Sequence, residues 1–265
     1  MEMNKCVLLG RGIYKDIPDE LTLKKIPTVS ELDYASGEEF DKVLIDSILP
    51  VSIAEKINFN ELLEIDFQWL CRALRIENYG PYHTTNAIWC DQCGSTSHGE
   101  YQVDLRSIGC KELPPGFTND FVIKRDEFID FNGDIKFRLP TIQKINNAYK
   151  DKAFQTADGR VNREFARICY MVSSIKGKDA LTPIEIKLQL QKDLSPADYI
   201  ILKGIVNDMA DFGLRAGGEC ECPKCGSQKA AFIGLTEDRF FRPTLADLKL
   251  WKQNRAQEAK AAKPE

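Results

Sequence analysis

The sequence is poor in histidine and lacks the common phosphate-binding and metalloprotease motifs. Its 265 residues include only two histidines, His83 and His98, so a Ser-His-Asp or Cys-His catalytic centre would need one of them. Neither stands beside a persuasive catalytic partner. The chain also has no Walker-type loop, no GxGxxG after a predicted strand and no HExxH. These absences argue against an enzyme.

Three aspartates, Asp66, Asp104 and Asp198, are the remaining candidates for general acids or bases. Isolated acids of this kind are more often helix caps or salt-bridge partners. We therefore predict no catalytic residue, no small-molecule substrate and no organic cofactor.

The chain also lacks an excess of positive charge and long apolar runs. The formal net charge is -4, so no global positive field attracts a nucleic acid or an anionic membrane. No apolar run approaches the roughly 20 residues that span a bilayer, and the first apolar stretch is too short for a signal peptide. We expect a protein that stays in the compartment where it is made, without membrane partners.

What the sequence does have is nine cysteines, an odd number that favours thiols and a metal site over a disulfide framework. Four of them form two knuckles that share the pattern CxxCGS, Cys90/Cys93 and Cys222/Cys225. Two thiolates in this spacing can reach one ion from a tight turn, and the glycine relieves the backbone there. Together the knuckles supply the four soft ligands of a closed tetrahedral zinc site.

The predicted zinc would join remote parts of the chain. Far more residues separate Cys93 from Cys222 than separate the knuckles of an ordinary zinc ribbon. A single shared structural ion would therefore staple two halves together, and its loss should loosen the whole chain.

Other uses of the cysteines stay open. The first knuckle could bind metal with His98 while Cys220 joins the second knuckle in a separate site. A redox pair is a further alternative, although neither knuckle begins a thioredoxin-like helix. The remaining thiols are predicted to be structural or core residues: Cys6, Cys71, Cys110 and Cys169.

The first part of the chain is predicted to contain short strands, two helices and a ribbon. Residues 21–26 are the best early strand, and helical apolar spacing covers residues 37–49 and 58–75. A two-stranded ribbon is expected around the first knuckle, over residues 88–105. Within residues 128–139, Asn132-Gly133 lies between two apolar runs, which predicts a tight hairpin.

Mainly helical sequence begins at Pro140. Thr182 and Ser195 each precede a proline and are followed three residues later by an acid, which predicts two helix starts. Residues 184–190 alternate with a strand period, but the cap favours a helix. A strand is expected after the second knuckle. No internal repeat is evident beyond the two knuckles.

These elements predict an α+β fold in three segments. Residues 1–139 form an α+β half with the first knuckle, and residues 140–253 form a mainly helical half with the second. The polar, alanine-rich residues 254–265 are predicted to be a frayed helix or flexible tail. The second knuckle is expected to complete the four-cysteine site.

Several short motifs follow one another along the chain. In the first half they are LLGRGIY (residues 8–14), Asp66, Leu74-Arg75, Tyr79-Gly80 with Tyr82, the first knuckle and Val103-Asp104-Leu105. In the second half they are Leu139-Pro140, Asp198, Gly213, the second knuckle and Phe240-Phe241 followed by Pro243. In this order they resemble the T-even-phage baseplate protein family, which serves the baseplate hub or its assembly in contractile-tailed phages. LLGRG stands where the family has proline-serine before the glycine, which indicates a distant member.

The resemblance implies a structural or assembly role in the hub region of a contractile-tail baseplate. It implies contacts with other tail proteins, and a place in the virion after synthesis in the host cytoplasm. A transient tail-assembly chaperone and a zinc-ribbon nucleic-acid binder are the alternatives. The last rests on basic and aromatic residues near the second knuckle: Lys224, Lys229, Arg239, Arg242, Phe232, Phe240 and Phe241. Phenylalanines in such an apolar setting are more often core.

Overall fold

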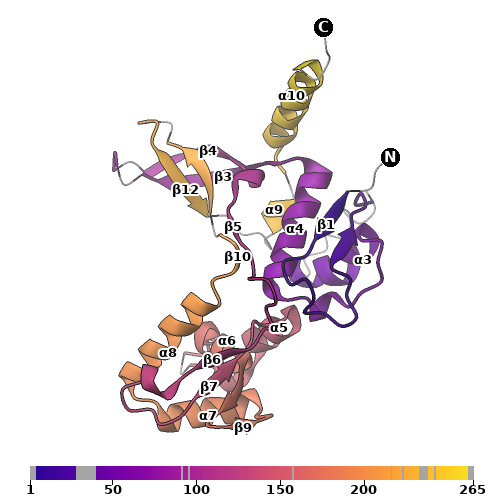
Figure 1. Ribbon diagram of the computed structural model, residues 1–265. Helices are drawn as coiled ribbons and strands as arrows, with labels where there is room; N and C mark the ends of the chain where they lie inside the picture. The colour runs from indigo at the N-terminus through magenta and orange to yellow at the C-terminus, as the bar shows by residue number, and fades with distance from the viewer. Residues whose placement is uncertain are drawn as a thin grey trace.

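The predicted α+β class is confirmed by a computed structural model, in which helices accompany small antiparallel sheets. The structure describes residues 4–27, 40–90, 92–94, 96–156, 158–215, 217–222, 224–232, 238–241 and 243–261. Figure 1 shows two bodies joined at a waist, a pair of β-hairpins beside them, and a C-terminal helix that projects away.

The N-terminal body packs short strands against helices. Its elements are β1 (Lys5–Val7), β2 (Glu20–Thr22), α2 (Phe40–Val43), the π-helical turn η2 (Leu44–Ile48), α3 (Leu49–Ser52), the 3-10 turn η3 (Phe59–Glu61) and α4 (Glu64–Tyr79). β1 and β2 pair antiparallel. The apolar stripe predicted for the last helix is buried, as expected for a core-facing side: Leu63, Phe67, Leu70 and Leu74.

The C-terminal body surrounds a four-stranded antiparallel sheet with helices. Its strands are β6 (Phe121–Ile123), β7 (Ile135–Phe137), β8 (Val172–Ile175) and β9 (Lys178–Asp179), in that order across the sheet. Its helices are the turns η5 (Arg125–Glu127) and η6 (Lys152–Phe154), with α5 (Ile142–Lys150), α6 (Arg163–Met171), α7 (Pro183–Asp193) and α8 (Pro196–Met209). Thr182 and Ser195 cap α7 and α8, so both predicted helix starts are confirmed.

The cysteine module consists of two hairpins, β3 (Tyr82–Trp89) with β4 (Thr96–Asp104) and β11 (Gly217–Glu221) with β12 (Gln228–Phe232). The 3-10 turn η4 (Leu105–Ser107) follows β4. β5 (Cys110–Lys111) pairs with β10 (Gly213–Leu214) at the waist. The short helix α9 (Asp238–Phe241) and the long helix α10 (Leu245–Ala261) complete the chain. Residues 254–261, predicted as frayed helix or tail, thus continue a helix.

The hairpin predicted around Asn132-Gly133 forms differently. Its strands are β6 and β7, which pair Phe121 with Phe137, and Asn132-Gly133 lies in the loop between them. Residues 128–131 are loop because Phe128 and Phe131 are buried while the N–H groups of residues 129–131 bind a distant carboxylate.

The predicted boundary at residue 139 falls inside the C-terminal body. β7 pairs with β8, so residues 121–139 share their sheet with the chain that follows them. Their side chains also belong to the same core as the helices α6 to α8. Backbone pairing across the sheet, which local sequence does not reveal, decides this boundary.

The two bodies repeat one order of elements, contrary to the expectation of no repeat beyond the knuckles. Each begins with a hairpin and continues through a helical segment to a third extended position, Ile53 bridged to Leu23 or β8 paired with β7. A long helix comes later in each body, α4 after η3 and α8 after β9 and α7. Next comes a glycine with positive φ, Gly80 at 81° or Gly213 at 89°, and then a strand leading to a knuckle.

In the N-terminal body a buried aspartate anchors the loop of the first hairpin. Asp66 is the third residue of α4 and is fully buried. Its carboxylate accepts hydrogen bonds from the N–H groups of Leu9 (2.5 Å) and Gly10 (3.1 Å) and from the Tyr14 hydroxyl. Burial nevertheless raises the pKa of Asp66 above its ordinary value, because these donors do not fully offset the loss of water.

Asp198 has the equivalent place in the C-terminal body. It is the third residue of α8, is fully buried, and accepts hydrogen bonds from the N–H groups of residues 129–131 at 2.7 to 3.2 Å. The Ser195 hydroxyl adds a fourth donor at 3.0 Å. Burial alone would raise the pKa of Asp198, but the hydrogen bonds outweigh it and the pKa lies below its ordinary value.

We expect Asp66→Asn and Asp198→Asn to change the acid dependence of stability in opposite directions. Ionised Asp198 stabilises the fold above the unfolded-state pKa of about 3.9, and this contribution is lost as pH falls through its lower folded pKa. The contribution of Asp66 is fully present below about 3.9 and is lost as pH rises through its higher folded pKa. Urea unfolding between about pH 3 and pH 7 measures both slopes. Slopes of the same sign would contradict the assigned pKa directions.

Candidate metal centre

Each knuckle forms the tip of a hairpin in the cysteine module. Cys90 directly follows β3 and the chain returns through β4, whereas Cys222 directly follows β11 and the chain returns through β12. The number of residues from Asp66 to Cys90 equals the number from Asp198 to Cys222. The long helix, the strand and the knuckle are therefore one repeated unit.

The glycine after each knuckle has the conformation that the sequence predicted. Gly94 has φ of 62° and Gly226 has φ of 71°, a region that residues with a Cβ rarely adopt. At the second knuckle the Gly226 N–H donates to the Cys222 carbonyl at 2.8 Å, and the Cys222 N–H donates to the Ser227 carbonyl at 2.9 Å. These bonds close the turn that carries the two sulfurs.

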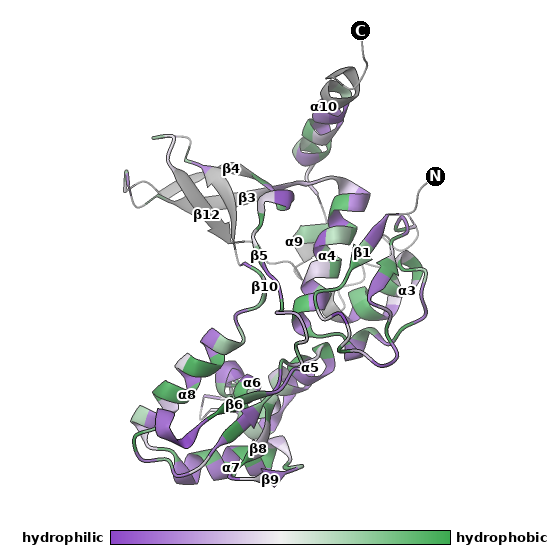
Figure 2. Ribbon diagram, viewed as in Figure 1, coloured by the Kyte–Doolittle hydropathy of each residue, from purple (hydrophilic) through white to green (hydrophobic). Residues whose placement is uncertain are grey.

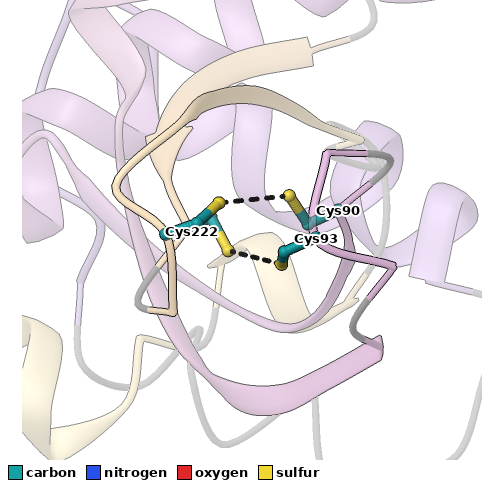
Figure 3. Close-up of side chains that lie close together, drawn as sticks. Cys90, Cys93 and Cys222 are labelled. Carbon is teal, nitrogen blue, oxygen red and sulfur yellow. Dashed lines mark hydrogen bonds between the residues drawn. The ribbon is translucent and has the colours of Figure 1, made fainter.

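The two knuckles meet although they lie far apart in sequence. The four Sγ atoms of Cys90, Cys93, Cys222 and Cys225 all lie within 4.8 Å of one another. Figure 3 shows Cys90 and Cys93 of the first hairpin facing Cys222 of the second. Cys90 and Cys222 are 1% exposed, so the cluster has a buried side.

The sulfur separations fit one tetrahedral ion better than disulfides. The Sγ atoms of Cys90 and Cys225 are 3.6 Å apart, and those of Cys93 and Cys222 are 3.9 Å apart. Zinc bonded to four sulfurs at about 2.3 Å would place them about 3.8 Å apart. A disulfide bond, at about 2.05 Å, is far shorter. The donor set and its spacing therefore suit a closed metal site.

Ser227 contributes a hydroxyl to this cluster. Its Oγ lies 3.3 Å from the Cys90 sulfur and 3.2 Å from the Cys225 sulfur. The Ser227 hydroxyl, helped by the backbone of Cys93, lowers the pKa of Cys90 to about 6. Cys90 is then a thiolate at neutral pH, which is the form that binds a metal. Ser227 is the serine of the second CxxCGS pattern, and the repetition of this serine in both knuckles is the sequence signal for its role.

Arg75, which sequence reasoning did not assign a role, fastens the first hairpin to α4. Its guanidinium is fully buried and donates to the carbonyls of Phe240 (2.7 Å), Gly80 (2.7 Å) and Tyr82 (2.9 Å). Burial lowers the pKa of Arg75 to about 10, so the side chain stays charged at neutral pH. One cation thus joins the end of α4, the start of β3 and α9.

The start of α10 closes on the same strand. Asp247, 1% exposed, accepts hydrogen bonds from the Thr84 hydroxyl on β3 and from the Thr244 N–H at 2.8 Å. A Cβ added to Gly80 would lie 2.4 Å from the Trp251 ring, so the glycine permits α10 to approach. The sequence TLAD repeats the capping pattern of SPAD at α8 and could have revealed this helix start.

The other cysteines have the places that the sequence indicated. Cys71 and Cys169 are fully buried, Cys6 is 4% exposed and Cys110 is half-buried. Burial raises the pKa of Cys6 and of Cys169 to about 12, which keeps these thiols protonated and inert. The side chains of Cys220 and His98 lie outside the described residues. The convergence of the two knuckles favours the shared site over two separate ones.

The aromatic residues invoked for nucleic-acid binding are core residues where they are described. Phe240 and Phe241 are each 1% exposed, and Phe240 packs against His83 with ring centroids 5.7 Å apart. They cannot stack with bases. The side chains of Lys229, Phe232, Arg239 and Arg242 lie outside the described part of the chain.

Comparisons with protein-family models, with curated proteins and with solved structures find no match to this chain. Within the described residues, no helix has both the length and the apolar character needed to cross a membrane.

Proposed function

We propose that this protein is a non-catalytic structural or assembly protein in which one zinc ion joins two repeated halves. The observation that carries the proposal is the convergence of Cys90, Cys93, Cys222 and Cys225 from two hairpins remote in sequence. Zinc suits four thiolates in tetrahedral spacing better than magnesium or calcium, which prefer oxygen ligands.

The site supports a structural role for the ion. Four protein thiolates fill the coordination of zinc, and catalytic zinc sites keep one position for water or substrate. The cysteine module is also fastened to its surroundings: β11 lies beside β4, and Arg75 and Asp247 tie β3 to α4, α9 and α10 (Figure 1). The metal would thus hold the hairpin that follows α4 to the hairpin that follows α8.

We further propose that the protein acts in a contractile-tail baseplate, as a hub component or as an assembly factor. The support is the ordered resemblance described above. Several of its motif residues lie at structural joints: Asp66, Arg75, Gly80, Asp198 and both knuckles. These residues fix the relation between loops, helices and the cysteine module. A baseplate part needs such a rigid frame in order to contact its neighbours.

Quantitative mass spectrometry of purified, intact tailed particles tests this role. A permanent subunit is expected at a fixed ratio to the major tail proteins. Abundance in the infected-cell lysate together with absence from particles would assign it to assembly instead. DNA binding that weakens steeply with salt would overturn the protein-contact proposal in favour of a nucleic-acid binder.

A further inference from the structure

The repeat exposes a difference between two equivalent grooves. In the N-terminal body, the first turns of α4 and the preceding helical segment form a groove lined by Ile45, Glu64, Phe67 and Gln68. Helix α5 lies in it, also touching η3, and only about 100 Å³ of space remains. We call this the covered groove.

Helix α5 fills the covered groove with three residues at helical spacing. Ile142 and Ile145 are 6% and 7% exposed, and Tyr149 follows one turn later on the same face. The Ile142 N–H also donates to the Leu62 carbonyl at 2.9 Å. A helix with aliphatic, aliphatic and aromatic side chains at i, i+3 and i+7 is thus what this groove accepts.

In the part of the chain that the structure describes, no helix lies in the equivalent groove of the C-terminal body. It lies between α6, α7 and α8. In the order of elements, α6 corresponds to the helical segment before Ile53, α7 to η3, and α8 to α4. Its volume is about 290 Å³, and its main lining residues are Phe165, Leu190, Gln191, Leu194, Pro196 and Tyr199. Tyr199 and Phe67 correspond, since each directly follows the buried aspartate. We call this the open groove.

Large apolar side chains are also exposed on α7 and α8, the helices that supply most of the lining of the open groove. Ile200 is 69% exposed and corresponds to Gln68, which lines the covered groove. On α7, Leu188 is 60% and Ile184 is 48% exposed, which explains the strand-like alternation of that helix: one apolar face is buried and the other is not. Figure 2 shows hydrophobic stretches along α7 and α8. Exposed apolar side chains on the helices that border an apolar groove are consistent with a docking surface.

The charges around the groove indicate the polarity of its occupant. The carboxylates of Glu164 and Asp193 already pair with Lys203 at 2.9 Å and with Lys176 at 2.6 Å. Lys192, which follows the lining residue Gln191 on α7, is exposed and adds one positive charge beyond these two pairs. An occupant with acidic residues beside its apolar face complements this rim.

We propose that the open groove binds an amphipathic helix of a partner protein, with the apolar spacing of α5 and acidic flanks. The proposal goes beyond the structural role of zinc, because it rests on the equivalence of the two grooves and on the exposed residues around one of them. Glu64 donates its N–H to the Pro140 carbonyl at the start of α5. Pro196 has the equivalent position in the open groove and has no N–H to donate, so the partner helix is held chiefly by side chains.

A hydrocarbon-stapled, fluorescently labelled peptide with the sequence of residues 140–151 is the probe, and fluorescence anisotropy with the full-length, zinc-loaded protein is the measurement. We expect saturable binding. A peptide carrying Lys144→Glu and Lys150→Glu should bind at least threefold more tightly, whereas one carrying Ile142→Asp and Ile145→Asp should not bind.

Gln191→Trp should weaken binding of the probe at least tenfold by filling the groove. Gln191 is exposed and outside the core, so the variant is expected to fold. Gln253→Trp, the same change at an exposed position of α10, should leave binding unchanged. Tyr199→Glu is a second variant that should also abolish binding.

Absence of binding would overturn the proposal. Equal affinity of the probe for the Gln191→Trp and Gln253→Trp variants would also overturn it, because the peptide would then enter the covered groove by displacing α5. Self-association of the protein that Gln191→Trp removes would assign the groove to a second copy and would also overturn it. None of these outcomes alters the test of zinc binding.

Discussion

Replacing both Cys93 and Cys222 with serine is expected to abolish zinc binding and to lower the melting temperature by about 10 °C or more. Together the two substitutions remove one ligand from each hairpin, so only two of the four thiolates remain and the site is no longer closed. Structural zinc can contribute on the order of 10 kcal/mol of apparent binding free energy to folding. Here the ion would join the hairpin β3–β4 to the hairpin β11–β12, so its loss should loosen the cysteine module and the waist together.

Metal analysis of the purified protein and thermal unfolding check this expectation. Wild-type protein should hold one zinc per chain, and a strong chelator should reproduce the effect of the double substitution. Cys110→Ser is the matched control, because Cys110 is half-buried and lies outside the four-sulfur cluster. Wild-type protein free of zinc, or a double variant as stable as Cys110→Ser, would refute the proposal that one zinc ion joins the two hairpins.

Replacing Arg75 with methionine is expected to lower the free energy of unfolding by about 3 kcal/mol or more. The change keeps the apolar bulk but leaves the carbonyls of Gly80, Tyr82 and Phe240 without their donor inside the protein. Since these carbonyls belong to the start of β3 and to α9, the first knuckle should also lose its alignment. Zinc should therefore bind more weakly in this variant than in the wild type.

Urea unfolding and a competitive zinc-chelator titration measure the two effects. Arg138→Met is the control, because Arg138 is largely exposed and pairs with exposed Asp120 at 2.8 Å. Exposed ion pairs contribute about 1 kcal/mol or less, so this variant should remain close to the wild type. Equal effects of the two substitutions would show that the buried guanidinium does not organise the hairpin.

The metal ligands could be predicted from sequence because their chemistry is local. Two thiols in CxxC spacing with a following glycine need only a tight turn, and Gly94 and Gly226 adopt the expected positive φ. Helix starts at Thr182 and Ser195 were predictable for the same reason, since a cap involves residues three positions apart. Zinc itself, as the metal, stays a prediction.

The roles of Arg75, Asp66 and Asp198 were not predictable in this way. Each side chain binds backbone groups far along the chain, such as the Phe240 carbonyl or the N–H groups of residues 129–131. A backbone donor or acceptor leaves no mark on the identity of its residue, so no sequence pattern announces such a partner. The aspartates therefore looked like isolated acids.

By itself the sequence determined which residues can hold a metal, where α7 and α8 begin and that the chain is α+β. The tertiary structure alone decided that both knuckles meet at one point, that residues 121–139 join the later sheet, and that the two bodies repeat one plan. The physical reason is range. Caps, turns and thiol spacing act within a few residues, whereas strand pairing and buried backbone hydrogen bonds join positions that only the folded chain brings together.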